Sequence, residues 1–117
     1  MYKIALLLGI LLILNSCQLD YTMDFKIKNE TSMLVDSLYL LPNKDGKKYI
    51  QLKPQEVVNY TVDISETPMG DGAFVISYTL DGQKKQRGFG YFDNHNTFAD
   101  HYDLTIKKDT LIIKEIR

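Results

Sequence analysis

The clearest pattern in the chain is an alternation of apolar and polar residues with a period of two. In residues 58–64, Val58, Tyr60, Val62 and Ile64 share one face, and polar residues lie between them. Because successive side chains of a strand point to opposite faces of a sheet, this pattern predicts a strand with one buried face. Further runs alternate in the same way or are rich in β-forming residues: 24–28, 33–41, 48–52, 73–80, 83–92, 101–107 and 110–116.

Short polar segments separate these runs. The strongest hairpin signal is Asp81-Gly82, because a two-residue type I′ turn needs a positive φ at both positions. We expect irregularities near Asp36-Ser37 and at Gly88-Phe89-Gly90. We also expect a polar loop over 93–100. The sequence does not show which face of the last strand is buried. No stretch repeats with the period of a helix. The pattern predicts an all-β fold, an antiparallel β-sandwich of immunoglobulin-like type with about seven to eight strands, and a small open barrel is the alternative.

An uncharged apolar segment precedes the strands. Residues 4–14 carry no charge and follow the positive charge of Lys3. The segment has the length of a signal-peptide core and is shorter than the roughly 20 residues that span a bilayer. It therefore predicts a secretory signal rather than part of the fold.

The single cysteine follows this segment. Leu14-Asn15-Ser16-Cys17 resembles the bacterial lipobox, with Asn15 departing from its commonest form. The resemblance implies that the Cys17 sulfur takes a diacylglycerol, that a peptidase cuts between Ser16 and Cys17, and that the freed amine is acylated in turn. Two or more acyl chains anchor a protein stably, whereas one chain holds it only marginally. One cysteine excludes a disulfide within the chain.

These observations predict three parts. Residues 1–16 are a cleaved lipoprotein signal peptide, 17–23 are the lipidated N-terminus and a short tether, and 24–117 are the β-sandwich domain. The tether reaches about 20 Å when extended, so we expect the domain close to a membrane. Gln18 follows the cysteine in place of the aspartate that favours inner-membrane retention, which predicts the outer membrane and leaves its periplasmic or surface face open.

The charge balance excludes one class of partner. Without Lys3, 13 Lys and Arg face 15 Asp and Glu, a net charge of −2. No basic stripe is present, so nucleic acid is not an expected partner. The densest basic cluster, 84–87, is interpreted as a solvated flank of a turn.

Residues 93–103 hold the most suggestive chemistry. His95 and His101 could ligate a metal together with Asp93 or Asp103, but their spacing matches no compact metal motif. We therefore expect no metal or other cofactor, with these four residues as weak candidates. No Gly-x-Ser-x-Gly elbow occurs, so the chain is not expected to be an enzyme.

Tyrosine is abundant in the predicted strands. Tyrosine suits binding faces because it offers a rigid ring and a polar tip, but it also fills small cores, and we favour the core. The residues concerned are Tyr49, Tyr60, Tyr78, Tyr91 and Tyr102.

Two short motifs suggest modification. Asp36-Ser37-Leu38 and Asp109-Thr110-Leu111 resemble sites at which some gut-type bacteria O-glycosylate exported proteins. The resemblance implies possible sugars on Ser37 and Thr110, which the intact mass of the mature protein would reveal.

Two further motifs carry a family resemblance. Residues 52–56 are similar to the Leu-x-Pro-Gly-Glu turn of secreted immunoglobulin-like modules, with Gln55 in place of glycine, and a Phe-Gly-Tyr strand occurs at 89–91. The chain resembles small uncharacterised lipoproteins of gut-type Gram-negative bacteria. The resemblance implies a membrane-anchored, non-enzymatic binding or structural module of the cell envelope with an envelope protein or glycan as partner. The alternatives are an immunity or inhibitor lipoprotein against a secreted toxin and a metal-binding domain.

Overall fold

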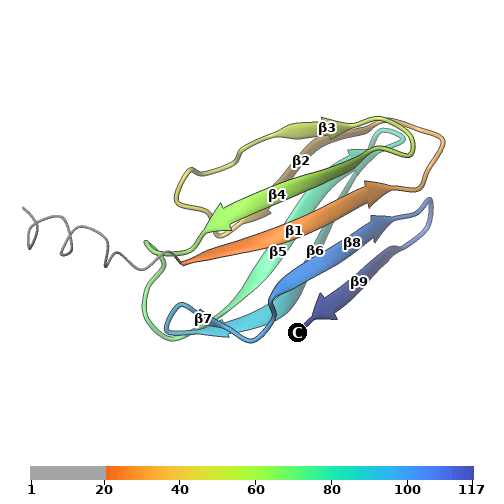
Figure 1. The fold of residues 1–117 in the computed structure, drawn as a ribbon. Coiled ribbons are helices and arrows are strands. Elements are labelled where there is room, and N and C mark those ends of the chain that lie inside the picture. Colours follow the sequence, from red (N-terminus) through yellow and green to blue (C-terminus); the bar gives the residue numbers. More distant parts are fainter. Residues whose placement is uncertain (1–20) are drawn as a thin grey trace, which may run out of the picture.

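The computed structural model describes residues 21–117, which fold into nine strands (Figure 1). The strands are β1 (Thr22–Asn29), β2 (Val35–Leu41), β3 (Ile50–Leu52), β4 (Val57–Asp63), β5 (Asp71–Leu80), β6 (Gln83–Asp93), β7 (Asn96–Thr97), β8 (His101–Ile106) and β9 (Leu111–Ile116). Within residues 21–117, no helix has the length and apolar character needed to cross a membrane.

The strands form two sheets that pack face to face (Figure 1). The four-stranded sheet has the order β4-β1-β8-β9, and the five-stranded sheet has the order β3-β2-β5-β6-β7. All neighbouring strands are antiparallel except β1 and β8, which are parallel. The predicted β-sandwich is therefore confirmed. In immunoglobulin domains the first two strands share a sheet, whereas β1 and β2 lie in opposite sheets here, so the likeness is one of architecture rather than of strand order.

The core lies between the sheets and follows the predicted alternation. Tyr60, Val62 and Ile64 of β4 and its C-terminal end are buried, as predicted. The centre of the core is aromatic: the ring centroid of Phe25 lies 5.1 Å from that of Phe74 and 5.6 Å from that of Tyr102. A large apolar side chain that is fully buried contributes about 1.5–3 kcal/mol relative to an exposed one. These rings therefore hold the two sheets together.

Two boundaries differ from the prediction, and the structure assigns the buried face of the last strand, which the sequence left open. The sandwich begins at Thr22 rather than at residue 24, because Met23 is buried in β1 and belongs to the core. The expected loop over 93–100 contains a hairpin, because β6 runs to Asp93 and pairs with the short strand β7. The last strand buries Leu111 and packs Ile113 against the core, whereas Ile112 is exposed.

The predicted irregularities are present. Ser37 has a φ of 50°, and the register of β2 shifts on both of its sides. Asp81 and Gly82 have φ values of 52° and 71°, as a type I′ turn requires. Gly90 has a φ of 73° and lies where β6 shifts against β5. Gln55 has a φ of 66° at the position where the similar motif has glycine, so this turn keeps the backbone conformation without the residue that favours it.

A buried asparagine joins the two sheets at one end. The Asn29 side chain donates hydrogen bonds to the carbonyl oxygens of Met33 (2.8 Å) and Leu52 (3.0 Å). Its Oδ1 accepts from the Thr31 backbone N–H at 2.9 Å. These bonds tie β1 to β3, the edge strand of the five-stranded sheet, and satisfy polar atoms that would be costly to bury unpaired.

Candidate functional site

The predicted lipidation site precedes the described part of the chain. Ser16 and Cys17 lie outside residues 21–117, so cleavage and lipidation there stay predictions. Tyr21, the first described residue, is four residues beyond Cys17. An extended chain of four residues spans at most about 14 Å.

The two histidines of the predicted cluster have different partners. His95 Nε2 lies 2.7 Å from the carbonyl oxygen of Thr67, and its ring packs 5.0 Å from that of Tyr21. His101 Nδ1 lies 2.9 Å from Asp100 Oδ2, and its Nε2 lies 3.6 Å from Asp103 Oδ1. Asp93 ends β6 and is half-buried.

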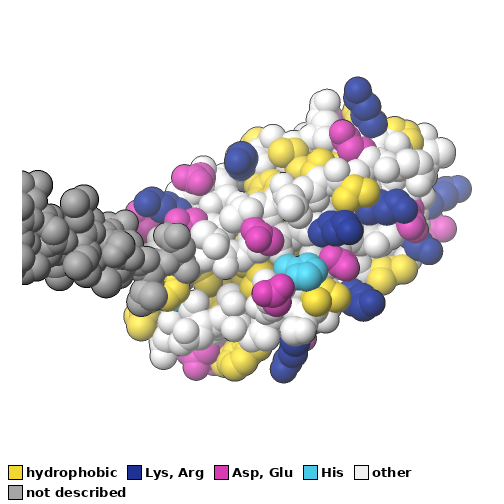
Figure 2. Space-filling view, in the orientation of Figure 1, with side chains coloured by type: hydrophobic (Ala, Val, Ile, Leu, Met, Phe, Trp, Pro, Cys, Tyr) yellow, Lys and Arg dark blue, Asp and Glu magenta, His cyan; other side chains and the backbone are white. Residues whose placement is uncertain are grey.

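No metal-binding arrangement follows from these contacts. Within residues 21–117, no group of three or more His, Cys, Asp and Glu side chains is placed to hold a metal ion. Figure 2 shows basic and acidic side chains interspersed over one face of the molecule. The contacts of His101 with Asp100 and Asp103 are therefore those of a surface side chain.

The two possible glycosylation sites are both exposed. Ser37 lies in the bulge of β2, and Thr110 lies in the turn between β8 and β9. Both hydroxyls are therefore accessible from solvent. Modification of either residue stays a prediction.

The strand tyrosines divide into two groups. Tyr60, Tyr78 and Tyr102 are buried in the core, and burial raises the pKa of each phenol. Tyr49 and Tyr91 are exposed. The preference for the core is thus confirmed for three of the five residues and is wrong for two.

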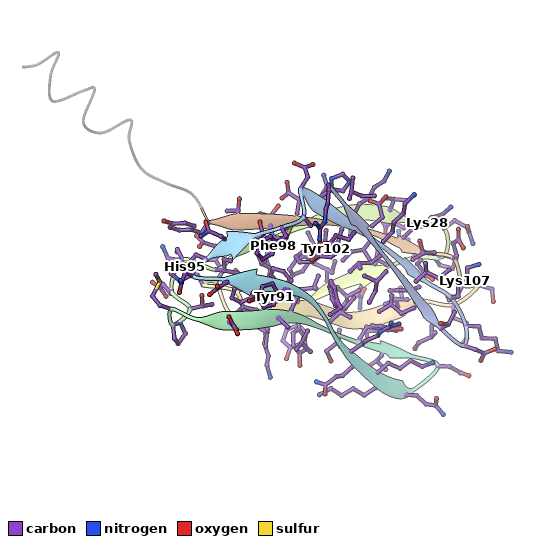
Figure 3. All side chains as sticks on the ribbon, turned by 90° about the horizontal axis from the view of Figure 1, so that it is seen from below. Lys28, Tyr91, His95, Phe98, Tyr102 and Lys107 are labelled. Carbon is purple, nitrogen blue, oxygen red and sulfur yellow. The ribbon has the colours of Figure 1, made fainter. Side chains whose placement is uncertain are left out.

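Tyr91 belongs to an exposed aromatic pair beside β7. Its ring stacks on that of Phe98 with the centroids 5.4 Å apart (Figure 3). Its hydroxyl donates to Asp71 Oδ1 at 3.0 Å. This hydrogen bond raises the pKa of Tyr91. The polar tip of the tyrosine is therefore already engaged within the protein.

A more open arrangement lies on the outer face of the five-stranded sheet. A hollow of about 320 Å³ is lined there by six residues, which we call the tyrosine hollow: Ser37, Tyr39, Tyr49, Ser77, Thr79 and Lys84. Residues of β5 that alternate with its buried face, together with their strand partners, form its floor. Ligand sites are concave, with a few placed polar groups on an aromatic or apolar lining.

The strand register places these residues in two rows. Tyr39 pairs with Ser77, which pairs with Gln86, so aromatic, hydroxyl and amide groups cross β2, β5 and β6 in one line. In the neighbouring line, Thr79 pairs with Lys84 on one side and with Asp36 on the other.

The bulge at Ser37 makes this arrangement. Val35 and Leu38 are both buried, so the extra residue between them reverses the alternation and places Tyr39 on the outer face, outside the core cluster, where the residue is 5% exposed. Bulges re-aim side chains in this way and are common next to functional sites. Strained backbone at a non-glycine residue also points to a function rather than to packing alone.

Positive charge surrounds the two tyrosines of the hollow. The ring of Tyr49 meets that of Tyr39 edge to face at 5.2 Å, and Lys47 Nζ lies 5.2 Å from the Tyr39 ring centroid. A hydrogen bond with Ser77 lowers the pKa of Tyr39, and the ammonium groups of Lys47 and Lys84 lower it further. The carboxylate in the neighbouring row, Asp36, is engaged: its Oδ1 accepts from Gln51 Nε2 (2.9 Å) and from the Ser37 N–H (2.7 Å).

A glycine widens the same face. Gly88 pairs with Val75, next to the row that contains Ser77. A Cβ at this position would meet no atom nearer than the Phe74 carbonyl oxygen at 3.8 Å, and the φ of Gly88 is not positive. Neither space nor backbone requires glycine here. An unexplained glycine within a strand often marks a close approach by a ligand or another chain.

A larger hollow, of about 410 Å³, lies elsewhere. It is formed by turn residues of mixed charge, among them Glu30, Asp81, Lys85 and Asp109, and no aromatic side chain lines it. We therefore place the candidate site at the tyrosine hollow, where aromatic, hydroxyl and cationic groups converge.

Comparison with known proteins adds no further residues. The chain was compared with models of protein families, with curated proteins and with solved structures. No match was found in any of them. The candidate site therefore rests on the residues of this chain.

Sequence reasoning missed the centre of this site. In the sequence, Tyr39 lies within an apolar run, and Lys84 belongs to the basic cluster 84–87 that is interpreted as the flank of a turn. The signal was nevertheless present, because the Asp81-Gly82 turn fixes the register that places Thr79 opposite Lys84 and Ser77 opposite Gln86. The effect of the bulge on Tyr39 needed the structure.

Proposed function

We propose that the protein is a lipid-anchored, non-enzymatic binding module of the bacterial cell envelope, held in the outer membrane through Cys17. The lipobox-like residues 14–17 support the anchor. The binding role is carried by one observation: the outer face of the five-stranded sheet has a hollow that is lined by the exposed ring of Tyr49, by hydroxyl side chains and by Lys84. Such groups give orientation and specificity in recognition.

The first experiment tests the anchor. Cells that express the full chain with a C-terminal tag are grown with a labelled fatty acid and then fractionated. We expect the wild-type chain to carry the label and to need detergent for release from the membrane, and Cys17→Ala to lack the label. A wild-type chain that is unlabelled and released by salt alone contradicts the anchor.

The second experiment tests the binding role. Envelopes with the tagged wild-type chain are crosslinked, and the captured material is compared with that from Tyr49→Ala and from the matched control Tyr91→Ala. Both residues are exposed, Tyr49 by 59% and Tyr91 by 45%, but only Tyr49 lines the hollow. We expect a crosslinked species that Tyr49→Ala loses and Tyr91→Ala keeps. Capture that neither variant changes contradicts binding at the hollow.

Protease treatment of intact cells then determines the face of the membrane. Loss of the tag with an intact periplasmic control indicates a surface-exposed domain and a capture role. Protection of the tag until the envelope is opened indicates a periplasmic domain.

A further inference from the structure

We propose that the tyrosine hollow binds a sugar ring that carries an anionic group, so that the ligand of this module is an acidic glycan. The inference rests on the proposed binding function and names its ligand class. Three properties of the described residues support it: an exposed aromatic ring, neutral hydroxyl groups in the lining of the hollow, and cations beside them.

The aromatic ring suits the apolar face of a sugar. Tyr49 is 59% exposed, and its edge-to-face contact with Tyr39 orients the ring at the rim of the hollow. One face of a pyranose ring presents mostly C–H groups, which pack against an aromatic ring, while its hydroxyls remain free for hydrogen bonds. Tyrosine loses little conformational entropy when it makes such a contact.

The floor suits sugar hydroxyls. Ser37 is exposed and Thr79 is half-buried, and each lines the hollow with a hydroxyl that both donates and accepts. Ser77 lies deeper, is 1% exposed and hydrogen-bonds to Tyr39. A sugar hydroxyl also donates and accepts, so Ser37 and Thr79 can match hydroxyls of one ring. A volume of about 320 Å³ is at the lower end of the range for ligand sites, which favours one or two rings.

The cations specify an acidic sugar. Lys84 lines the hollow, and Lys47 lies over the Tyr39 ring. The nearby Asp36 carboxylate already accepts two hydrogen bonds, from Ser37 and Gln51, and so is held on the β3 side of the hollow. A carboxylate or phosphate on the sugar would therefore meet Lys84.

Other partner classes fit less well. A protein partner needs about 800 Å² of surface on each side with a largely apolar centre, and this floor is polar. Single-stranded nucleic acid needs several stacking rings along a basic groove, and the hollow has one exposed ring. An acidic sugar can contact the aromatic ring, the hydroxyls and the cation of the hollow at once.

The test titrates the lipidated full chain, purified in detergent, with four probes. These are a glucuronate-containing disaccharide, its carboxyl-reduced neutral counterpart, glucose 6-phosphate and inorganic phosphate. The first and third probes separate a carboxylated from a phosphorylated sugar. The second and fourth test whether charge and ring are both needed.

We expect at least one acidic sugar to bind at least tenfold more tightly than both the neutral disaccharide and inorganic phosphate. Tyr49→Ala and Lys84→Gln should each weaken that binding at least tenfold, and the control Tyr91→Ala should not. The proposal is overturned if no acidic sugar binds, if the neutral sugar or phosphate binds equally well, or if all three variants behave alike.

Failure of this inference is distinguishable from failure of the proposed function. The mass of the purified chain reports the lipid on Cys17 before any titration begins. The crosslinking experiment reports a partner of any chemistry. A lipidated chain that captures a partner at the hollow but ignores acidic sugars keeps the function and overturns the ligand class.

Discussion

The two faces of β5 are built by alternate residues of one strand, yet they are explained by different physics. On the inner face, Phe74, Ile76 and Tyr78 are at most 4% exposed, and all belong to the core cluster. On the outer face, Val75 is 37% exposed, and Ser77, although only 1% exposed, lies outside the core cluster among hydroxyl, amide and aromatic groups. Packing requires the first set. Because packing does not require the second set in the same way, the outer face is where a binding function can be sought.

Two glycines of β6 repeat this contrast. At Gly90 a Cβ would lie 2.6 Å from the Tyr102 hydroxyl and 3.1 Å from Phe74 Cδ2, so the core requires glycine. At Gly88 a Cβ would meet nothing nearer than 3.8 Å. Glycine is thus required by the core at position 90, whereas at position 88 it only leaves the outer face open.

The largest expected effect comes from the inner face. Phe74→Ala should lower the free energy of unfolding by about 3–5 kcal/mol, because it removes a buried ring and leaves a cavity. The neighbouring outer-face change, Val75→Ala, should cost less than about 1 kcal/mol. Urea denaturation followed by circular dichroism measures both. Equal losses for the two variants would contradict the contrast between the faces.

The next largest effect is expected at Gly90. Gly90→Ala should lower the free energy of unfolding by about 2–4 kcal/mol, because it adds the strain of a left-handed backbone to a clash with Tyr102. The same denaturation measurement applies. A fully stable Gly90→Ala variant would show that β6 can move away from the core at this point.

A smaller effect of opposite sign is expected at Gly88. Gly88→Ala should raise the free energy of unfolding by about 0.5–1 kcal/mol, because alanine restricts the unfolded chain and its methyl group has room. The pair of variants therefore separates a structural glycine from one that the fold does not need. A loss of stability at Gly88 as large as that at Gly90 would give it a structural role and remove it from the argument for a ligand.

Most of the fold could be predicted from the sequence, because a strand with one buried face has apolar residues at every second position. The alternation over 58–64, 73–80 and 101–107 gave the buried residues of three strands, and Asp81-Gly82 gave the central hairpin. The order of the strands could not be predicted in this way. The parallel pairing of β1 with β8 joins segments far apart in the chain, and no local pattern encodes it.

The candidate site was less accessible to sequence reasoning. The two histidines are candidate metal ligands by residue type, yet His95 and His101 contact different partners in the structure. Tyr39 lies in an apolar run of the sequence, and only the bulge at Ser37 moves it from the core cluster to the outer face, where it is 5% exposed. A one-residue shift reverses the face of every later side chain in a strand, so a site placed by a bulge is hard to see without the structure.

The smallest expected effect lies in the order in which the tyrosines lose their protons. A hydrogen bond with Ser77 and two nearby ammonium groups lower the pKa of Tyr39, whereas burial raises the pKa of Tyr60, Tyr78 and Tyr102. Phenolate absorbance during an alkaline titration should therefore rise in separate phases. Tyr39→Phe should remove amplitude from the early part of the titration.

The sign of the stability change distinguishes the two faces in the same titration. A buried tyrosine whose pKa is raised stabilises the fold fully below its unfolded pKa of about 10, and this contribution falls as the pH rises through its folded pKa. Tyr78→Phe should therefore reduce the alkaline loss of stability. Tyr39 has a lowered pKa and the opposite sign, so Tyr39→Phe should steepen that loss. Tyr39 is itself only 5% exposed, so the sign depends on whether the Ser77 hydrogen bond and the ammonium groups of Lys47 and Lys84 outweigh its burial. If the two variants change the alkaline stability curve in the same direction, then burial prevails at Tyr39, and the cationic surroundings of the tyrosine hollow are contradicted.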